Sequence, residues 1–515
     1  MRRRAVRSSR PGPSPANADM GKKVACFYWL GVLLLTVSVR LYLFRNYYTI
    51  NNDGILYIEA ARHFWEGSWS RGLGSFYPPL FPLMIAGAFP LVGDWELAGQ
   101  FWPLALGVLV LFPLFGLVRR IYGNGIAQVA VLFYTVSPYL ARLSVHVRSE
   151  MPYIFFFVLA LYLLQRGIDH ESLREFLLAG ISTAIAYLIR SEGIGLIVVG
   201  SVLLLCRGWS RARLREAFRR AGLLFLGFAL FAAPYVLYLR QDTGSWLISR
   251  KAGLILSLGL AEYEPGTRSV TMEESERVGV VDLVRSHPFA YAKKSVLDLF
   301  RSLGVYFEAV HYSYLPFLCV GWYLFFTGRF WTKAEFTLAV AVIFYIVSFS
   351  LLYVNRRYAV PLVPLSLGWV AVGYVAFKDY ALKKWAGKGL LVAASALALF
   401  FAATLPKTLQ AVGREKFYLR EAGLYLRGKP GRPTIVTTNG RVAFYAEGEN
   451  RVSVRDGTEI TRLAGEGEND ILALDQKVFV EIRDRLDGRD WVVDRKFIGT
   501  GGEMLAILAR RGGTR

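Results

Sequence analysis

The chain has 515 residues, of which 54% are hydrophobic and only 19% are charged. A soluble protein of this length rarely needs so many uninterrupted apolar runs, so the composition predicts a polytopic membrane protein. The formal net charge of +22 does not indicate a nucleic-acid-binding protein, because the basic residues lie in short clusters between apolar runs, as cytoplasmic loops of membrane proteins do.

The first 23 residues are basic and rich in proline, and we expect them to form a disordered cytoplasmic tail. The next apolar run has no small-residue cleavage site after it, so we expect it to remain as a span. At about 20 apolar residues per span, about eleven spans are expected. They begin near residues 24, 99, 125, 152, 176, 193, 221, 314, 335, 357 and 388. The basic segments between them then place the N-terminus in the cytoplasm and the C-terminus outside.

This layout divides the chain into a tail (1–23), a transmembrane domain (24–405) and an extracytoplasmic domain (406–515). Two long outer loops, 46–98 and 241–313, face the same side as that last domain. Beyond residue 415 the sequence alternates short β-rich stretches with Asn-Gly and Glu-Gly turn signals, and "DWVVDRKFIG" and "EMLAILARRG" are typical of strands. We therefore expect a small mixed α/β domain there.

The first outer loop carries an acid, Asp53, just before an amphipathic pattern. The apolar residues of this pattern fall on one helical face, which predicts a helix lying along the membrane interface: Tyr57, Ile58, Ala61, Phe64 and Trp65. The proline-rich stretch "GSFYPPLFPLMIAGAFPLVG" indicates a second interfacial element. Taken alone, Asp53 is explained as a helix N-cap.

Three further charged motifs lie at span ends on the same predicted side. They are "RSEMPY" with Arg148 and Glu150, "LIRSEG" with Arg190 and Glu192, and "NRRYAVPLVP" with Arg356 and Arg357. Any one of these charges could simply extend to the interface. Together, however, they favour a site that holds an anionic lipid head group beside a carboxylate.

The order of these motifs resembles the integral-membrane glycosyltransferases of the GT-C class over roughly residues 24–380. The chain is most similar to relatives of the protein O-mannosyltransferases and of the aminoarabinose transferase that modifies lipid A. The resemblance implies a polyprenyl-phosphate-linked sugar donor, transfer on the outer face of the membrane, and a match between Asp53 and the catalytic acid of the first outer loop. Two departures leave the acceptor open between a lipid, a glycan and a protein. Phe76 and Tyr77 precede the double proline where the aminoarabinose enzymes carry an acid and a base, and no second acid stands beside Asp53.

If the resemblance holds, the reaction is a displacement at an anomeric carbon with inversion. Asp53 is then the general base, and arginine forks hold the phosphate: Arg356 or Arg357, with Arg148 and Arg190 behind them. Glu150 could orient the acceptor, take part in a metal site with Asp53, or pair with Arg148. The substrate pocket is expected to include Tyr57, Tyr77, Glu192 and Tyr358.

Metal and disulfide chemistry have little support in the sequence. Four of the five histidines fall outside the spans without ligand spacing (His63, His146, His287 and His311), and the three cysteines form no CxxC pair. We expect no structural metal, no tightly bound cofactor and no nucleic acid, and we leave open a labile divalent cation.

Three other classes of function remain as alternatives. A secondary transporter usually places its ionisable residues near the bilayer midplane and shows paired repeats, and neither is evident in the sequence. An O-antigen ligase or polymerase would use a diphosphate-linked donor on the same face. A purely structural membrane scaffold would not explain why the charged motifs lie on one side of the membrane. The favoured location is the plasma membrane of a bacterium or archaeon.

Overall fold

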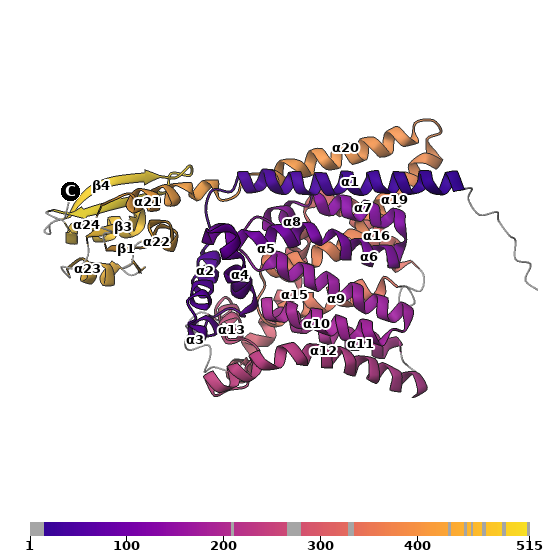
Figure 1. Ribbon diagram of the computed structural model, residues 1–515, viewed down its shortest axis with the longest axis horizontal. Helices are drawn as coiled ribbons and strands as arrows, with labels where there is room; N and C mark the ends of the chain where they lie inside the picture. Colours follow the sequence, from indigo (N-terminus) through magenta and orange to yellow (C-terminus); the bar gives the residue numbers. More distant parts are fainter. Residues whose placement is uncertain are drawn as a thin grey trace, which may run out of the picture.

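Two parts make up the chain in the computed structural model: a bundle of helices up to residue 408, and a small α/β domain at one end of that bundle (Figure 1). We call this end of the bundle the domain end. The structure describes residues 15–207, 211–264, 280–327, 334–430, 434–447, 451–454, 457–465, 470–486 and 491–511.

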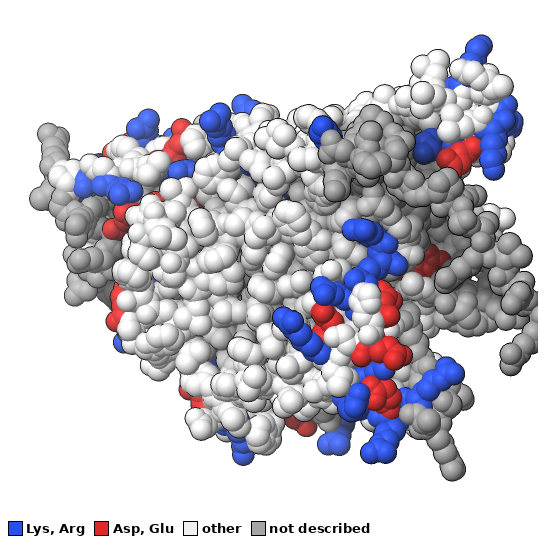
Figure 2. Space-filling model, turned by 45° about the vertical axis from the view of Figure 1, so that its right-hand side comes forward, with Lys and Arg blue, Asp and Glu red and all other residues white. Residues whose placement is uncertain are grey.

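Six helices among the described residues are long and apolar enough to cross a membrane: Ala25–Arg45, Trp95–Tyr122, Glu150–His170, Arg213–Thr243, Arg356–Lys384 and Gly389–Thr408. A seventh span results if the pair Pro288–Val310 and Tyr312–Phe326, bent by 86°, is counted as one. Figure 2 shows a broad uncharged surface between charged side chains at its margins, as lipid contact requires. The chain is therefore an integral membrane protein, whereas the number of eleven spans stays a prediction.

Apart from the two long loop regions after α1 and after α12, the helices of the bundle follow one another with short connections. Their bounds are α1 (Pro15–Arg45), α5 (Trp95–Leu109), α6 (Leu111–Tyr122), α7 (Asn124–Thr135), α8 (Pro138–Leu143), α9 (Glu150–His170), α10 (Leu173–Ile189), η1 (Ser191–Ile194), α11 (Gly195–Arg207), α12 (Arg211–Thr243), α16 (Leu315–Phe326), α17 (Phe336–Leu351), α18 (Arg356–Ala359), η5 (Val360–Leu362), α19 (Val363–Lys384) and α20 (Gly389–Thr408). Several of the expected spans, such as α7 and α17, are shorter than 18 residues.

The N-terminal boundary differs from the expectation. Helix α1 begins at Pro15, so residues 15–23 are helical, although we expected them in a disordered tail. These nine residues contain no β-branched side chain and a single glycine, so nothing in them stops the helix of the span from extending outward. Residues 1–14, the rest of the expected tail, lie outside the described residues.

Small residues let two neighbouring helices approach closely. A Cβ atom on Gly180 of α10 would lie 2.1 Å from the carbonyl oxygen of Leu224 in α12, and one on Gly227 would lie 2.3 Å from the carbonyl oxygen of Leu177. Close backbone approach of this kind is how helices associate in a membrane, where lipid competes equally for apolar surface. The contact fixes where α10 ends, and hence where Arg190 lies.

The first outer loop forms three helices: α2 (Asn52–Trp65), α3 (Trp69–Leu73) and α4 (Leu80–Val92). Of the face expected to lie in the interface, Tyr57, Ile58, Ala61 and Phe64 are buried within the protein, and only Trp65 is largely exposed. Helices α4, α5 and the α/β domain cover this face. The apolar stripe of α2 therefore anchors the helix to protein and not to lipid.

The second expected loop, 241–313, contains more helix than its assignment as a loop suggests. It includes α13 (Ala252–Ala261), α14 (Val280–Ser286), α15 (Pro288–Val310) and the start of η3 (Tyr312–Tyr314). The sharp bend between α15 and α16 falls at His311, whose φ of 77° lies in the left-handed region. Residues 265–279 lie outside the described residues.

The C-terminal domain is a five-stranded mixed sheet with the order β2-β1-β3-β5-β4. Its strands are β1 (Ile435–Thr437), β2 (Arg451–Ser453), β3 (Ile471–Asp475), β4 (Trp491–Ile498) and β5 (Met504–Arg510). Strand β1 pairs in parallel with β2 and β3, and β5 pairs antiparallel with β3 and β4. Both C-terminal strands expected from the sequence, within "DWVVDRKFIG" and "EMLAILARRG", are present.

Helices cover both faces of this sheet: α21 (Phe417–Arg427), α22 (Gly440–Ala446), α23 (Gly457–Gly465) and α24 (Gln476–Leu486). Along β3, Ile471 and Ala473 join one apolar core with α21 and α22, while Leu472 and Leu474 join another with α23 and α24. The two-residue period of a strand thus separates the side chains into two layers. One sequence expectation is wrong: Asn439-Gly440 is not a turn between strands, because the Asn439 side chain caps α22 by accepting from the Arg441 N–H.

The C-terminal domain holds the segment that leads into α2. Tyr445 OH donates to Glu96 Oε1 at 2.7 Å and accepts from the Ile50 N–H at 2.8 Å. Arg441 Nε donates to the Ile50 carbonyl at 2.7 Å. Both backbone groups of Ile50 are therefore bonded to a domain about 390 residues further along the chain.

We expect Tyr445→Phe to lower the free energy of unfolding by roughly 1–3 kcal/mol, because the buried Glu96 carboxylate and the Ile50 N–H lose a partner together. Thermal unfolding of the purified protein in detergent measures the change. Tyr425→Phe is the matched control, because its hydroxyl donates to the partly exposed Asp494 in the same domain. Equal effects of the two substitutions would contradict the proposed importance of the Tyr445 contact.

Candidate active site

Asp53 lies in the first turn of α2 but does not cap it. Asn51 is the N-cap: its side chain accepts from the Gly54 N–H at 2.9 Å and its amide donates to the Val147 carbonyl at 3.2 Å. The Asp53 carboxylate instead pairs with Arg357 Nη1 at 2.5 Å and accepts from Tyr77 OH at 3.2 Å. The capping explanation for Asp53 is thus wrong, since a neighbouring residue performs that role.

Glu150, the first residue of α9, is fully buried, and two guanidinium groups neutralise it. Arg357 approaches its Oε1 with Nη2 at 2.6 Å and Nε at 2.8 Å, and Arg190 Nη1 lies 3.3 Å away. The expected alternative, a pair with Arg148, is not formed. Arg357 therefore bridges the two acids, Asp53 and Glu150, through one fork.

Beyond Arg190, an acid and then a base extend the alternation of negative and positive side chains. Its Nη2 lies 3.1 Å from Glu192 Oε1, and Lys251 Nζ lies 3.5 Å from the same oxygen. The resulting charge row, as we call it, runs through Asp53, Arg357, Glu150, Arg190, Glu192 and Lys251. Burial lowers the pKa of Lys251, while the neighbouring Glu192 opposes that shift.

Aromatic side chains pack along the charge row. Tyr57 and Tyr77 lie with ring centroids 4.4 Å apart, and the Arg190 guanidinium lies 5.7 Å from the ring centre of Tyr358. Tyr57 also exchanges a hydrogen bond of 2.8 Å with Ser149 Oγ. Burial, followed by the charge of Asp53, raises the pKa of Tyr77, so it is a hydrogen-bond donor at neutral pH. The four residues expected in the pocket, Tyr57, Tyr77, Glu192 and Tyr358, all lie on the charge row or in contact with it.

Two of the expected arginines lie apart from it. Arg356 is half exposed, pairs with Glu308 at 2.5 Å, and stacks on Tyr139 with its guanidinium carbon 4.8 Å from the ring centre. Arg148 has a buried Nε without a partner in the structure. The structure therefore brings Asp53, Glu150, Arg190 and Arg357 together, whereas Arg148 and Arg356 face a different space.

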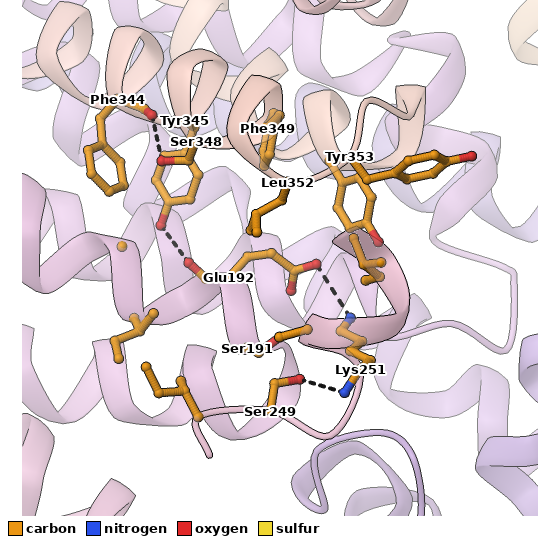
Figure 3. A pocket seen from close by; sticks show the side chains of 16 residues that line it. Ser191, Glu192, Ser249, Lys251, Phe344, Tyr345, Ser348, Phe349, Leu352 and Tyr353 are labelled. Atoms are coloured by element: carbon orange, nitrogen blue, oxygen red, sulfur yellow. Dashed lines mark hydrogen bonds and ion pairs between the residues drawn. The ribbon is translucent and has the colours of Figure 1, made fainter. Parts of the chain in front are cut away.

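Two cavities adjoin these residues. The larger, which we call the apolar cavity, has a volume of about 280 Å³ and lies between α11, α13 and α17. Figure 3 shows Glu192 and Lys251 at its polar side, with Phe344, Phe349, Leu352 and Tyr353 along the α17 side. The smaller, which we call the basic cavity, has about 170 Å³ and is lined by Arg142, His146, Arg148, Glu150, Arg356 and Arg357, among others.

Sequence reasoning missed Lys251, Asn51 and Arg142 as members of the site. Lys251 follows Arg250 in the long loop 241–313, and long loops of membrane proteins can carry basic residues on either side of the membrane, so the charge alone gives no signal. The signal that could have identified it is its place directly before the apolar run 252–261. Among the described residues no group of three His, Cys, Asp or Glu side chains is placed to hold a metal ion. The expectations about metals and cofactors stay predictions.

Residues 77–238 match the family model for dolichyl-phosphate-mannose-protein mannosyltransferase. No curated protein sequence matches the chain. The family match begins at Tyr77 and spans the motifs that contain Glu150, Arg190 and Glu192. It ends before Lys251 and Arg357.

Solved structures resemble the chain over most of its length. ArnT from Cupriavidus metallidurans bound to undecaprenyl phosphate has a TM-score of 0.57 at 13% identity, covering 95% of this chain and 98% of that one. The archaeal oligosaccharyltransferase AglB from Archaeoglobus fulgidus, in complex with an inhibitory peptide and a dolichol-phosphate, has a TM-score of 0.53 at 12% identity, covering 88% and 70%. The arabinofuranosyltransferase AftD from Mycobacteria has a TM-score of 0.50 at 14% identity, covering 93% and 41%.

These proteins are glycosyltransferases of the GT-C class, so the resemblance seen in the order of the motifs is confirmed. At 12–14% identity the likeness establishes a shared fold. It includes both parts of the chain, since the ArnT match covers nearly all of it.

We expect a neutral His146 to make the protein sensitive to acid. Burial, followed by Arg148 and Arg142, lowers the pKa of His146 to about 3. Between pH 6.5 and about 3 the unfolded chain therefore binds a proton that the folded chain does not, and unfolding is favoured as the pH falls. His146→Gln should reduce the loss of thermal stability between pH 7 and pH 5. An unchanged difference between the two pH values would contradict this assignment.

Proposed function

We propose that the protein transfers a sugar from a polyprenyl phosphate to an acceptor hydroxyl, with Asp53 as the general base. The observation that carries the proposal is that Asp53 does not cap a helix and instead contacts Arg357 and Tyr77, at one end of a charge row whose other end, Lys251, lines an apolar cavity. The similar structures of ArnT and AglB contain undecaprenyl phosphate and a dolichol-phosphate, which supports a lipid-linked donor of this kind. We place the reaction on the extracytoplasmic face of a bacterial or archaeal plasma membrane, with the N-terminus inside.

The apolar cavity suits the prenyl chain of the donor. Its lining is largely apolar, and its polar side carries Lys251 beside Glu192 (Figure 3). Arg190 pairs with the same Glu192 from outside the lining. A phosphate placed there would meet the Lys251 ammonium, and the Arg190 guanidinium, which keeps a buried Nε without a partner, adds its positive charge from behind Glu192. The sequence assigned the donor phosphate to Arg356 or Arg357, with Arg148 and Arg190 behind them. The placement proposed here keeps only Arg190 near the phosphate and gives Arg357 the role of holding Asp53.

The donor sugar would then lie close to the base. Lys251 Nζ is 6.0 Å from the ring centre of Tyr77, and Tyr77 OH donates to Asp53. A phosphate at Lys251 therefore places the sugar attached to it over Tyr77 and toward Asp53. Aromatic rings offer a flat apolar face to a sugar and a hydroxyl to its polar edge.

The chemistry is a single displacement. The acceptor oxygen forms a bond to the anomeric carbon while the bond from that carbon to the phosphate oxygen breaks, and the electron pair leaves with the polyprenyl phosphate. The acceptor proton passes to the Asp53 carboxylate, and attack opposite the leaving group inverts the anomeric configuration. Cations near the leaving phosphate stabilise the charge that develops on it.

Arg357 and Glu150 prepare the base for this role. Arg357 holds one oxygen of Asp53, and Glu150 in turn holds the Arg357 fork through two of its nitrogens. Glu150 contacts guanidinium groups and is fully buried, so we assign it as a positioning residue. Direct orientation of the acceptor by Glu150 is the less favoured of the roles that the sequence left open.

We expect Asp53→Asn to lower the rate of transfer by about 10²- to 10⁴-fold, as loss of a general base does, while donor binding is largely preserved. Single-turnover transfer and equilibrium donor binding are measured on the same preparation. Asp94→Asn is the control, because Asp94 caps α5 by accepting from the Leu97 N–H and lies outside the site. Turnover of Asp53→Asn near the wild-type rate would contradict the assignment of Asp53 as the general base.

We expect Lys251→Met to weaken donor binding by about 10- to 100-fold, the size of a lost charge-assisted hydrogen bond, and Lys251→Arg to restore part of it. The assay uses a panel of polyprenyl monophosphate and diphosphate sugars. Preferential use of the diphosphates would favour an O-antigen-ligase-like reaction. Normal donor binding by Lys251→Met would show that the phosphate lies elsewhere.

A further inference from the structure

The basic cavity holds more positive charge than its acids neutralise. Four arginines line it, Arg142, Arg148, Arg356 and Arg357, against one acid, Glu150. That acid is already shared between Arg357 and Arg190, and Arg356 is paired with Glu308 outside the cavity. Two guanidinium groups, those of Arg142 and Arg148, are left without a carboxylate.

The side-chain hydrogen bonds of Arg142 are with neutral groups, and the charge of Glu415 acts on it only from beyond ion-pair distance. Arg142 donates to the Gln410 side-chain oxygen at 3.1 Å and toward the Ala411 carbonyl at 3.5 Å. Arg148 keeps a buried Nε without a partner. Within the described part of the chain no carboxylate lies within 4.0 Å of either guanidinium. Charges placed in a partly buried pocket without counter-ions are costly, so such a pocket favours an anion supplied from outside.

Helix α18 separates this cavity from the apolar cavity. Arg356 and Arg357 of α18 and Val360 at the start of η5 line the basic cavity, while Tyr358 of α18 lines the apolar cavity. Arg357 and Glu150 line the basic cavity, and Arg357 pairs with Asp53. On the other side, Lys251 of the apolar cavity lies near the ring of Tyr77, whose hydroxyl donates to Asp53. Each cavity is thus connected to the same carboxylate through one intervening contact.

We propose that the basic cavity binds a phosphate group carried by the acceptor. The proposal rests on the proposed function, in which the donor chain and its phosphate occupy the apolar cavity. Inverting displacement requires the acceptor to enter from the side opposite the leaving phosphate, and the basic cavity offers a separate entrance of that kind. A phosphate suits it better than a carboxylate, because two guanidinium forks match a dianion with three acceptor oxygens.

The acceptor phosphate takes no part in the bond changes. Its oxygens stay bound by Arg142 and Arg148 while a hydroxyl of the same molecule loses its proton to Asp53 and joins the anomeric carbon. The phosphate therefore acts as a handle that holds the hydroxyl in reach. A lipid head group and a soluble phosphate compound both offer this chemistry.

Binding without turnover tests the proposal. The full-length protein is placed in phosphatidylcholine nanodiscs, and binding of glycerol 3-phosphate is measured by equilibrium dialysis. A second set of nanodiscs contains phosphatidic acid, which reports whether a lipid phosphate displaces the soluble one. Glycerol is the uncharged probe, and polyprenyl phosphate binding is measured in parallel. The variants are Arg148→Gln, Arg142→Gln and the double substitution, with Arg119→Gln at the opposite end of the bundle as the matched control.

We expect wild type and Arg119→Gln to bind glycerol 3-phosphate alike, and each cavity substitution to weaken binding roughly tenfold, with thermal stability within a few degrees of wild type. Polyprenyl phosphate binding should change by less than about twofold. Displacement by phosphatidic acid identifies a lipid phosphate as the ligand, and its absence identifies a soluble one; both support the proposal. If Arg142→Gln unfolds the protein, Arg148→Gln alone decides.

Equal phosphate binding by wild type and Arg148→Gln would overturn the proposal, as would equal binding of glycerol and glycerol 3-phosphate. A parallel loss of polyprenyl phosphate binding would also overturn it, because the cavity would then belong to the donor. These results differ from a failure of the proposed function. That failure appears as transfer that does not depend on Asp53, while the phosphate binding measured without turnover is unaffected.

Discussion

The buried carboxylate of Glu150 constrains the domain end of the bundle more than any other group. A charge removed from water costs several kcal/mol unless it is paired and hydrogen-bonded. Arg190 follows α10 and Arg357 lies in α18, so both elements must end at the depth where α9 begins. Arg357 then extends the same constraint to Asp53 in α2, and Arg190 extends it to Glu192 and Lys251. One buried acid thereby aligns segments that are distant in sequence.

The sequence predicted that Asp53, Glu150, Arg190, Glu192 and Arg357 would lie near one another, because charged residues at the ends of apolar runs on one side of a membrane share a depth. It missed Lys251, and it placed with them Arg148 and Arg356, which lie outside the charge row. It did not predict their partners. Arg148 is two residues from Glu150, but it precedes α9 and lines the basic cavity, while Arg357 reaches Glu150 across the bundle. Partner choice depends on helix rotation and crossing, which local sequence does not encode.

Other differences between the sequence expectations and the structure arise because one local sequence pattern is compatible with two structures. Asn followed by Gly at 439–440 is compatible with a turn or with a helix N-cap, and only the surrounding sheet decides between them. An apolar stripe such as that of α2 fits a lipid surface or a protein surface equally well. The span count depends on length, and several helices here are short or bent, so a pattern of apolar runs does not define how many cross the bilayer.

The bonds between Ile50 and the C-terminal domain have a consequence for biosynthesis. Residues 441 and 445 satisfy the backbone beside the first acid of the site, yet the ribosome makes them about 390 residues after it. A nascent chain inserts its spans in order, so the segment before α2 stays unsupported until the last hundred residues have been made and folded. A truncated product therefore carries every span but an unsupported entry to α2. Only a molecule that has been synthesised to its end and has folded its final domain can therefore support the entry to α2.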